Sequence, residues 1–294
     1  MRRSEILFRA AERHPTATRA ILSAAACGYL PDELLTSWWG QELLRRLPDK
    51  PILSRINGEV FEVPPVAAVF YRSFETQSVR LLQAEIQPHM SIVDVGANIG
   101  YLTVVAARLA YAGKVHAIEP GPINRLTLER NIARHRITNV RVYGLAVGDR
   151  AGVVTLSMTE DRLNDSTAAE PATRVLRRIE VPQARLDDLV EGPVDFVKID
   201  VQGGEIAVLR GMEETIRANP KLKVLVEWEP RYLARSGHKA EDLIDALRSS
   251  GLQHLRVIDD HAGQERSLEE MRRVFAEDAA GDRYCNILAS RTPS

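Results

Sequence analysis

The chain has 294 residues, of which 45% are hydrophobic and 27% are charged, with 39 Lys and Arg against 40 Asp and Glu. This is the composition of an ordinary globular protein. The near-zero net charge excludes a general polyanion binder, because affinity for a phosphate backbone needs a clustered excess of Lys and Arg. Two cysteines, Cys27 and Cys285, are too few for a disulfide framework. We therefore expect a protein of the reducing, cytoplasmic compartment that does not bind nucleic acid.

No segment has the composition of a membrane span or of a secretory signal. The longest uncharged run, Val95–Ala107, contains two glycines and an asparagine. It is shorter than the roughly 18–20 apolar residues that a span needs. The basic N-terminus, MRRSEILFRAAERHP, lacks both an apolar centre and a small-residue cleavage site. The sequence thus predicts neither a span nor a signal peptide.

The first 63 residues differ from the rest and are interpreted as a helical segment that precedes a main domain over residues 64–294. Apolar residues recur every three or four positions over 9–26 and 32–47, which predicts two helices. The segment is either a structural cap on the main domain or a lid that selects the acceptor. Its helices are also candidates for packing between the subunits of a homo-oligomer.

From Ser91 onward, apolar runs and helical patterns alternate. The predicted strands are 91–95, 114–118, 139–147, 194–199, 222–226, 255–258 and 284–289, and the predicted helices are 99–112, 122–135, 204–219 and 240–250. This alternation is typical of an α/β, Rossmann-like, doubly wound sheet, here with seven mostly parallel strands and helices on both faces. The segment 152–186 breaks the rhythm and predicts an added hairpin with a polar surface loop over 159–171.

Acidic residues stand at the carboxyl ends of the predicted strands, which is where ligands bind in an open doubly wound sheet. They are Asp94, Glu119, Asp149, Asp200, Glu227, Glu229, Asp259 and Asp260. A helix cap or a solvated loop explains any one of them. A whole series along one edge favours a binding site.

The strongest single motif is Val93–Gly100, in which a strand ends, the chain turns at Gly96 and a helix begins near Gly100. Glycine permits a positive φ and lets a ligand approach the backbone closely. The spacing departs from the G-x-G-x-x-G pattern of dinucleotide sites, which disfavours a pyrophosphate ligand. An adenosine-like ligand with an amino-acid tail suits this acidic turn better, because its carboxylate can meet the free N–H groups at the helix start.

Two further acids complete the expected nucleoside site. Glu119 ends the strand after Asp94, where a carboxylate accepts hydrogen bonds from both hydroxyls of a ribose. Asp149 follows the third predicted strand and is placed to accept from the exocyclic amine of an adenine. The alternatives are that Glu119 caps the next helix and that Asp149 only forms a turn.

Four ordered motifs resemble those of the FkbM-type methyltransferases, which are S-adenosylmethionine-dependent enzymes of the seven-stranded class I fold. They are VDVGANIGYLT at 93–103, IEP at 118–120, LAVGD at 145–149 and VDFVKIDVQGGEIAVLRG at 194–211. The resemblance covers residues 70–290 and implies O-methylation of a hydroxyl on a sugar, glycolipid or polyketide-type acceptor. One departure is Gln202, since the family usually has glutamate at this position, in KIDVEG.

The resemblance also implies individual cofactor contacts. Asp94, Gly96, Asn98 and Gly100 would line the methionyl end of S-adenosylmethionine, Glu119 would hold the ribose, and Asp149 would lie on the adenine side. The full expected cofactor-binding set is Asp94, Gly96, Ala97, Asn98, Gly100, Tyr101, Glu119, Ala146, Asp149 and Asp200.

Methyl transfer to a hydroxyl needs alignment and a base, because an alcohol is a poor nucleophile until it loses its proton. Asp200 is the expected base, since it ends the central strand beside the expected methyl group. Its pKa would have to be raised by burial or by neighbouring acids. The other candidate bases are Glu227, Glu229, His238, His254 and His261.

The same acids allow a metal site, and the sequence leaves two other functions open. Three of the carboxylates, Asp200, Glu227 and Glu229, are an alternative set of Mg²⁺ ligands, but carboxylates alone do not define a site and no metal is predicted. A non-catalytic cofactor-binding scaffold is a second function, which the departure at Gln202 leaves open. A nicotinamide-dependent oxidoreductase is a third, and the missing G-x-G-x-x-G argues against it.

Overall fold

The computed structural model describes residues 15–27, 51–65, 75–159, 165–168, 174–278 and 283–293. The chain divides into two compact units, the first with Met1–Phe74 and Glu160–Leu163 and the second with Glu75–Thr159 and Asn164–Ser294. The predicted helix over 32–47 lies outside the described residues, and so does the first part of the predicted helix over 9–26.

The first unit contains one described helix, α2 (Pro15–Ala26), and a β-hairpin that was not predicted. Strands β1 (Ile52–Ile56) and β2 (Glu59–Val63) pair antiparallel. Asn57 and Gly58 between them have φ values of 43° and 95°, as a two-residue hairpin turn requires. The amide of Leu53 donates to Ser23 Oγ at 3.0 Å, which ties α2 to β1. The segment 1–63 is therefore not purely helical.

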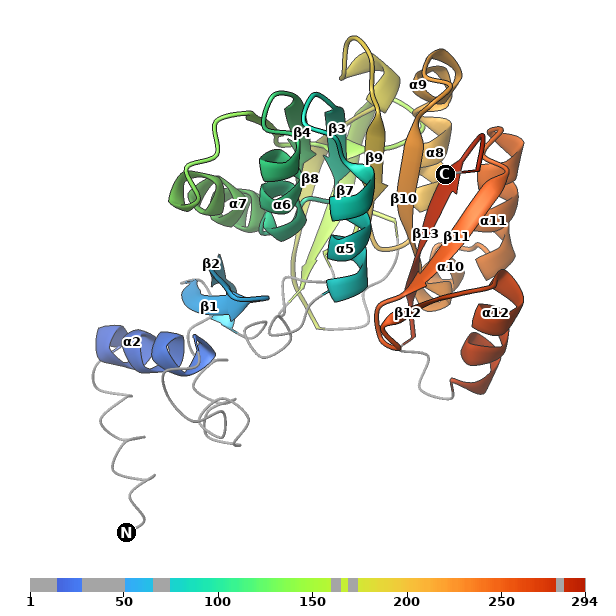
Figure 1. Cartoon of the computed structure of the whole chain (residues 1–294). Coiled ribbons are helices and arrows are strands. Elements are labelled where there is room, and N and C mark those ends of the chain that lie inside the picture. The colour runs from blue at the N-terminus through green and yellow to red at the C-terminus, as the bar shows by residue number, and fades with distance from the viewer. Residues whose placement is uncertain are drawn as a thin grey trace. The chain divides into compact units, whose positions relative to one another are not determined.

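An eight-stranded sheet forms the centre of the second unit, in the order β12-β11-β13-β10-β9-β3-β4-β5 (Figure 1). Its strands are β3 (Ser91–Val95), β4 (Lys114–Ile118), β5 (Val140–Tyr143), β9 (Phe196–Ile199), β10 (Lys223–Trp228), β11 (His254–Asp259), β12 (Gln264–Arg266) and β13 (Cys285–Ser290). The five strands from β10 to β5 are parallel, and β13 runs antiparallel to both of its neighbours. The doubly wound, mostly parallel sheet is thus confirmed. The strand beyond the predicted seven is β12, which pairs with β11.

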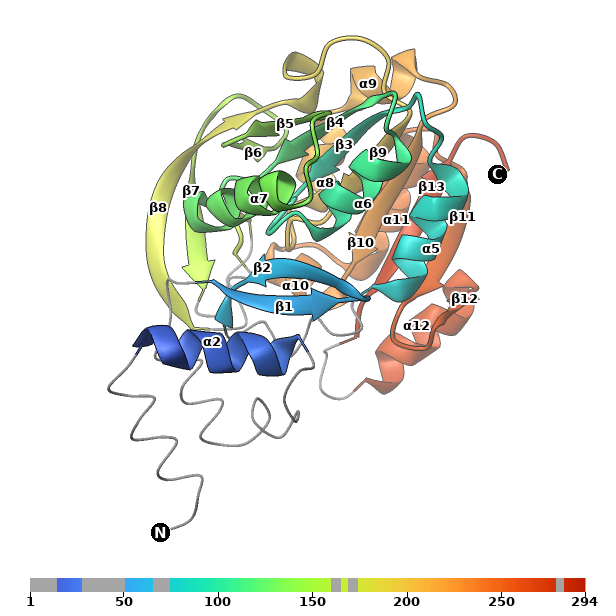
Figure 2. The same cartoon turned by 60° about the vertical axis from the view of Figure 1, so that its left-hand side comes forward.

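Helices cover both faces of this sheet, as the sequence predicted. On one face lie α5 (Thr76–Glu85), α6 (Tyr101–Leu109) and α7 (Pro122–Arg134), and on the other lie α8 (Glu205–Arg210) and α11 (Ala240–Ser249) (Figures 1 and 2). The remaining helices of this unit are α9 (Glu213–Ala218), α10 (Pro230–Arg235), α12 (Leu268–Glu277) and the short 3₁₀ helix η2 (Leu186–Asp188). The predicted helix 204–219 is broken into α8 and α9, because the chain passes Gly148 so closely at Gly211 that a Cβ there would lie 2.0 Å from the Gly148 carbonyl oxygen.

A separate three-stranded sheet is formed by the part of the chain between β5 and β9. It consists of β6 (Ala146–Val147), β7 (Gly152–Thr159) and β8 (Val175–Ala184), and the antiparallel pair β7–β8 is the predicted hairpin. The predicted strand 139–147 is wrong as one element. Its first part is β5 of the main sheet and its end is β6, because the chain turns away at Gly144, where a Cβ would lie 2.1 Å from Arg125 Nη1.

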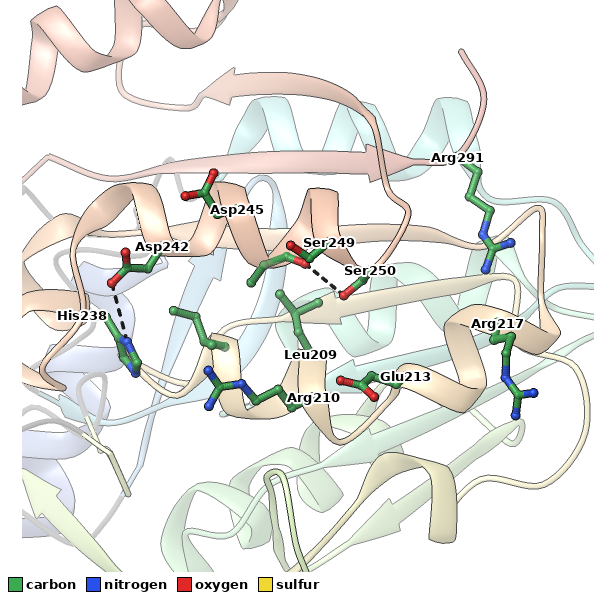
Figure 3. Close-up of a pocket in the computed structure, with 12 residues that line it drawn as sticks. Leu209, Arg210, Glu213, Arg217, His238, Asp242, Asp245, Ser249, Ser250 and Arg291 are labelled. Carbon is green, nitrogen blue, oxygen red and sulfur yellow. Dashed lines mark hydrogen bonds and ion pairs between the residues drawn. The ribbon is translucent and has the colours of Figure 1, made fainter.

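An open hollow of about 700 Å³ lies on the α8 and α11 face (Figure 3). Its lining residues come from α8, α9, α11 with the residues that flank it, and the segment after β13: Ile206, Leu209, Arg210, Glu213, Arg217, His238, Asp242, Asp245, Ala246, Ser249, Ser250 and Arg291. Cationic and anionic side chains alternate around it, so it carries no strong single charge. None of the acids predicted at the strand ends lines it.

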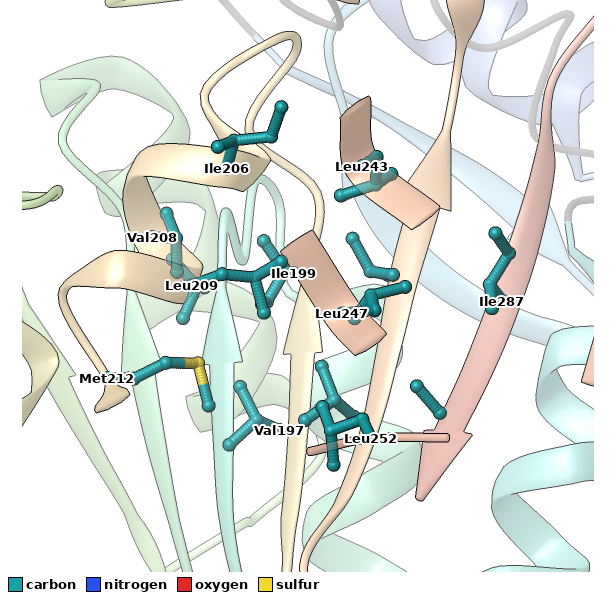
Figure 4. Packing of buried hydrophobic residues seen from close by; sticks show 14 of the residues in the cluster. Val197, Ile199, Ile206, Val208, Leu209, Met212, Leu243, Leu247, Leu252 and Ile287 are labelled. Carbon is teal, nitrogen blue, oxygen red and sulfur yellow. The ribbon is translucent and has the colours of Figure 1, made fainter. Parts of the chain in front are cut away.

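The main core lies between the sheet and the helices of this same face. Val197 and Ile199 of β9 and Ile287 of β13 pack beneath Leu209 of α8 and Leu247 of α11 (Figure 4). Because side chains alternate along a strand, the residues between these apolar ones point to the opposite face. The polar side chains of the central strands therefore meet on the α5 side of the sheet.

Replacing Leu247 by alanine tests this core. Leu247 is fully buried, so we expect Leu247→Ala to lower the free energy of unfolding by about 2–5 kcal/mol through lost burial and a residual cavity. Leu126→Ala is the control, because Leu126 is 47% exposed on α7. Urea unfolding followed by fluorescence measures both. Equal losses in the two variants would contradict the assigned packing.

Candidate active site

Five of the predicted acids lie at the carboxyl edge of four adjacent parallel strands. They are Asp94 in β3, Glu119 after β4, Asp200 after β9, and Glu227 and Glu229 at the end of β10. Four of them are at most 8% exposed, whereas the Asp200 side chain is 21% exposed. Asp200 is thus the member of this group that an incoming molecule reaches most easily.

Asp149 was predicted to follow the third strand of the main sheet, and this placement is wrong. It follows β6 of the small sheet, not the third strand of the main sheet, and its side chain is exposed. Ala146 is buried in β6. Within the described residues, no hydrogen bond joins Asp149 to Asp94 or Glu119. The break at Gly144 that separates β5 from β6 is the physical reason.

The turn after β3 has the backbone shape that its glycines predicted. Gly96, Asn98 and Gly100 have φ values of 83°, 50° and 86°. A Cβ on Gly96 would lie 1.7 Å from the carbonyl oxygen of Asp200, so only glycine fits between β3 and β9. The amides of Gly96 and Ala97 both donate to the carbonyl of Ile118 at 3.0 Å, which ties the turn to the end of β4. The first helical residue, Tyr101, is buried.

Glu119 is held against this turn by two backbone amides. Asn98 N donates to Glu119 Oε2 at 2.9 Å and Gly121 N donates to Oε1 at 2.7 Å. Burial raises the pKa of Glu119 to about 8, against the lowering effect of these hydrogen bonds, and Asp165 and Asp94 add to the rise. The structure therefore joins the predicted ribose-binding acid directly to the glycine turn.

A buried lysine, Lys198, sits among the acids. Its Nζ lies 3.0 Å from Asp200 Oδ2 and 3.8 Å from Asp94 Oδ1. Burial by itself would lower the pKa of Lys198, but Asp200, Asp94 and Glu75 together raise it above its usual range. Thr103 Oγ1 donates to Asp94 Oδ2 at 2.5 Å, so this carboxyl is fixed from the α6 side as well. Burial still leaves the pKa of Asp94 raised.

Asp200 and Glu227 are bridged by the side chain of Gln202. The amide Nε2 donates to Asp200 Oδ1 and to Glu227 Oε2, each at 2.9 Å. Burial would raise the pKa of Asp200, but Lys198 and the hydrogen bonds from Lys198, Gln202 and Glu227 hold it below its usual value. Burial and the charge of Asp200 raise the pKa of Glu227 well above its usual value. The expected rise in the pKa of Asp200 is therefore not found.

Two more buried glutamates border the pair. Glu205 Oε1 accepts from the amides of Gly203 at 3.0 Å and Val201 at 3.3 Å, and burial raises its pKa to about 7. Glu229 accepts from Arg231 Nη2 at 3.1 Å, and burial outweighs this cation and raises its pKa to about 7. Several acids at this edge are thus neutral or half-ionised near pH 7.

Two residues near this edge, Glu75 and Tyr284, were not predicted as site residues, and Asp260 was predicted only as one of the strand-end acids. Glu75 is buried just before α5 with φ 45°, and burial raises its pKa to about 8. Asp260 accepts from Gln77 N at 2.6 Å and Ser78 N at 3.1 Å and so caps α5. Burial and the charges of Glu75 and Glu227 raise the pKa of Tyr284. Lys198, although inside a recognised motif, was given no role either.

The histidines lie outside this group. His238 lines the hollow of Figure 3, with Nδ1 3.7 Å from Asp242 Oδ2. His254 is exposed at the start of β11. The ring of His261 packs edge-on against Tyr284 at 4.6 Å between ring centroids. None of the three contacts the predicted acids directly.

The described residues contain no group of three or more His, Cys, Asp or Glu side chains arranged to hold a metal ion, so the Mg²⁺ alternative gains no support. No described helix combines the length and the apolar composition that crossing a membrane requires.

Comparison with known proteins identifies the family. Residues 94–254 match the model of the methyltransferase FkbM domain. This match covers more than half of the chain, so the chain belongs to the FkbM methyltransferase family. The predicted resemblance is confirmed, and methyltransferase activity is the function that the family supports.

Individual relatives match over parts of their length. The 31-O-demethyl-FK506 methyltransferase FkbM of Streptomyces tacrolimicus is 30% identical over 204 residues, which is 58% of this chain and 75% of that protein. Methyltransferase 1 of Beauveria bassiana is 28% identical over 42% of this chain and 58% of its own length. The crystal structure of methyltransferase FkbM from Methylobacillus flagellatus superposes with a TM-score of 0.46 at 18% identity and covers 92% of this chain. This chain spans 58% of that structure's length.

Replacing Glu75 by glutamine tests the buried acids through the pH dependence of stability. Burial raises the pKa of Glu75 from 4.5 to about 8, helped by the charges of Asp200, Asp260 and Asp94 and opposed by Lys198. Between these two pH values, residue 75 has lost its proton in the unfolded chain but keeps it in the folded protein. The free energy of unfolding of the wild type therefore falls as the pH rises. Glu75→Gln, which stays neutral, should remove roughly 1–3 kcal/mol of the fall between pH 5.5 and 8.

Urea unfolding at the two pH values measures this effect. Glu277→Gln, at an exposed position of α12, is the matched control and should leave the pH dependence unchanged. If Glu75→Gln and the wild type lose the same stability between pH 5.5 and 8, Glu75 is ionised in the folded protein and the assignment fails.

Proposed function

We propose that this methyltransferase uses S-adenosylmethionine and transfers its methyl group to a hydroxyl of a sugar, glycolipid or polyketide-type acceptor. The observation that carries the proposal is the contact between Glu119 and the glycine turn, through the hydrogen bond from Asn98 N at 2.9 Å. It brings an acid suited to ribose hydroxyls next to a backbone turn suited to an amino-acid tail. When bound, the cofactor supplies an electrophilic sulfonium methyl group.

The residues present fit this cofactor chemically. Glu119 keeps lone pairs on both carboxyl oxygens beyond its two backbone hydrogen bonds, and a ribose diol donates two hydrogen bonds. Asp94 Oδ1 is buried and accepts no hydrogen bond from the described residues. An ammonium group can donate to this acidic region.

Asp200 is the proposed base. A base must be ionised before reaction, which its lowered pKa secures, whereas burial keeps Glu227 protonated. A hydroxyl that received the methyl group would have to lose its proton, and the Asp200 carboxylate would take up that proton. The bound cofactor would supply the methyl group, and its leaving group would be a neutral thioether. The greater exposure of Asp200 supports this choice over Glu227 and Glu229.

The acceptor class is supported by the name of one relative. The Streptomyces tacrolimicus protein is named for a methyltransferase of 31-O-demethyl-FK506, so its acceptor position is an oxygen. We extend oxygen as the acceptor atom to this chain. Transfer to a panel of glycosides and macrolides with labelled cofactor tests the extension, and a chain that methylates only nitrogen or carbon acceptors refutes it.

Glu119→Ala tests the cofactor site. The loss of a buried hydrogen-bonding carboxyl should weaken binding of S-adenosylhomocysteine by about 1–3 kcal/mol, measured by calorimetry. The control is Glu180→Ala on exposed β8, which should bind like the wild type. Unchanged affinity in Glu119→Ala refutes the ribose assignment. Binding of NAD instead of S-adenosylhomocysteine would refute the cofactor.

Asp200→Asn tests the base. Asparagine keeps the shape and cannot take the proton, so we expect single-turnover methyl transfer to an accepted glycoside or macrolide to fall about 100-fold or more. Affinity for S-adenosylhomocysteine should change far less. Equal losses in transfer and affinity would make Asp200 a binding residue, and full transfer by the variant would exclude it as the base.

A further inference from the structure

Gln202 has a strained backbone conformation of the kind that is often found at functional sites. Its φ is 55°, in the left-handed region that a side chain with a Cβ disfavours, and Gly203 follows with φ 100°. Ser166 Oγ donates to the Gln202 carbonyl oxygen at 2.8 Å and fixes this strained backbone. Non-glycine residues persist in such conformations mostly where the surrounding structure holds them, often at functional sites.

The side chain is oriented to serve two carboxyl groups at once. Each of the two N–H bonds of the amide meets one carboxyl, Asp200 or Glu227, at 2.9 Å. In this orientation Gln202 Oε1 is buried and has no hydrogen-bond partner among the described residues. Leaving a buried acceptor unsatisfied costs free energy. If the amide were turned over, Oε1 would face the carboxyl groups of both Asp200 and Glu227. Asp200 would then lose the hydrogen bond that Nε2 donates to it.

We propose that Gln202 is a positioning residue that holds Asp200 and Glu227 together as one ionised and one protonated carboxyl, so that Asp200 is the single anion of the pair. The assignment deepens the proposed function, because it explains how the base is held. An amide supplies two donors and no charge. An ionised glutamate at this position would supply no donor and would add a third acid.

The surroundings favour a single negative charge on the pair. The charged and titratable groups that face it are Lys198 from β9, Asp94 from β3, Glu75 before α5, Glu205 from α8, Glu229 after β10, Asp260 after β11 and Tyr284 before β13. Lys198 is the cation of this set, and it already contacts Asp94 as well as Asp200. Within the described residues, Arg231 contacts Glu229 at 3.1 Å and no cation forms an ion pair with Glu227. A second carboxylate would therefore have to share Lys198 with Asp94 and Asp200, so the proton stays on Glu227.

Infrared difference spectroscopy of the whole chain tests the pair without any acceptor. A protonated carboxyl gives a carbonyl band, and the band that Glu227→Gln abolishes belongs to Glu227. In the wild type we expect this band to persist, as the pH is raised, to pH values well above those at which glutamates usually ionise. Gln202→Met removes both N–H donors and keeps a similar side-chain volume. The midpoint of the titration, which is the pH at which half of the Glu227 band is lost, should therefore rise by about one pH unit or more. Gln202→Glu should raise the midpoint further, because it adds a like charge.

Two controls separate this inference from packing and from the proposed function. Gln87→Glu adds an acid at an exposed position two residues after the end of α5 and should leave the midpoint of the Glu227 titration unmoved. Calorimetry with S-adenosylhomocysteine on the same samples should show nearly unchanged affinity in both Gln202 variants. Absence of wild-type binding would overturn the proposed cofactor but not the pair.

The pair itself is overturned by either of two results. One is a wild-type Glu227 band that disappears in the usual glutamate range. The other is a midpoint that Gln202→Met and Gln202→Glu both leave unmoved. If Gln202→Met does not fold, Gln202→Glu decides alone, since glutamate has nearly the same size and shape as glutamine.

Discussion

The acidic edge of the sheet depends on one buried cation. Lys198 brings its ammonium group close to Asp94 and Asp200, at 3.8 and 3.0 Å, in a place where burial alone would lower the pKa of the lysine. An isolated buried ammonium is costly, and so are isolated buried carboxylates. Each therefore requires the other. Without Lys198, the carboxyls of β3 and β9 would have to be protonated or exposed, and Asp200 would lose the charge that a base needs.

The parallel sheet is what makes this arrangement possible. Asp94 and Lys198 are register partners on neighbouring strands, and Glu227 lies on the next strand along. Alternation sends these side chains to one face and their apolar neighbours, such as Val197 and Val226, into the core on the other face. The apolar half of each strand thus supplies the stability that allows the polar half to hold acids at close range. Gly96 completes the edge, because only a residue without a Cβ lets β3 and β9 approach there.

Local patterns predicted much of this, and tertiary contacts account for what they missed. The glycine turn and the acids after β3, β4, β9 and β10 follow from apolar runs that end in polar residues. The Asn57-Gly58 hairpin turn is equally local, but it was not predicted, because the helical patterns over 9–26 and 32–47 led to a helical interpretation of the whole segment 1–63. Alternation also places Lys198 two residues before Asp200 on the same face, a signal that would have predicted the lowered pKa. In contrast, Glu75 reaches the acids only through the packing of α5, which no local pattern reveals.

The acids at this edge differ in charge because their partners differ, although they share burial. Asp200 has an ammonium and an amide as partners and stays ionised, whereas Glu227 has the amide and several acids and stays protonated. Two carboxyls with divergent pKa values are a common way to divide acid and base roles in one site. Here the division needs no second cation, because a neutral glutamine donates to both groups. Glutamine at position 202 gives this edge one acid fewer than a glutamate would, and it keeps the carboxylate of Asp200, the proposed base, ionised.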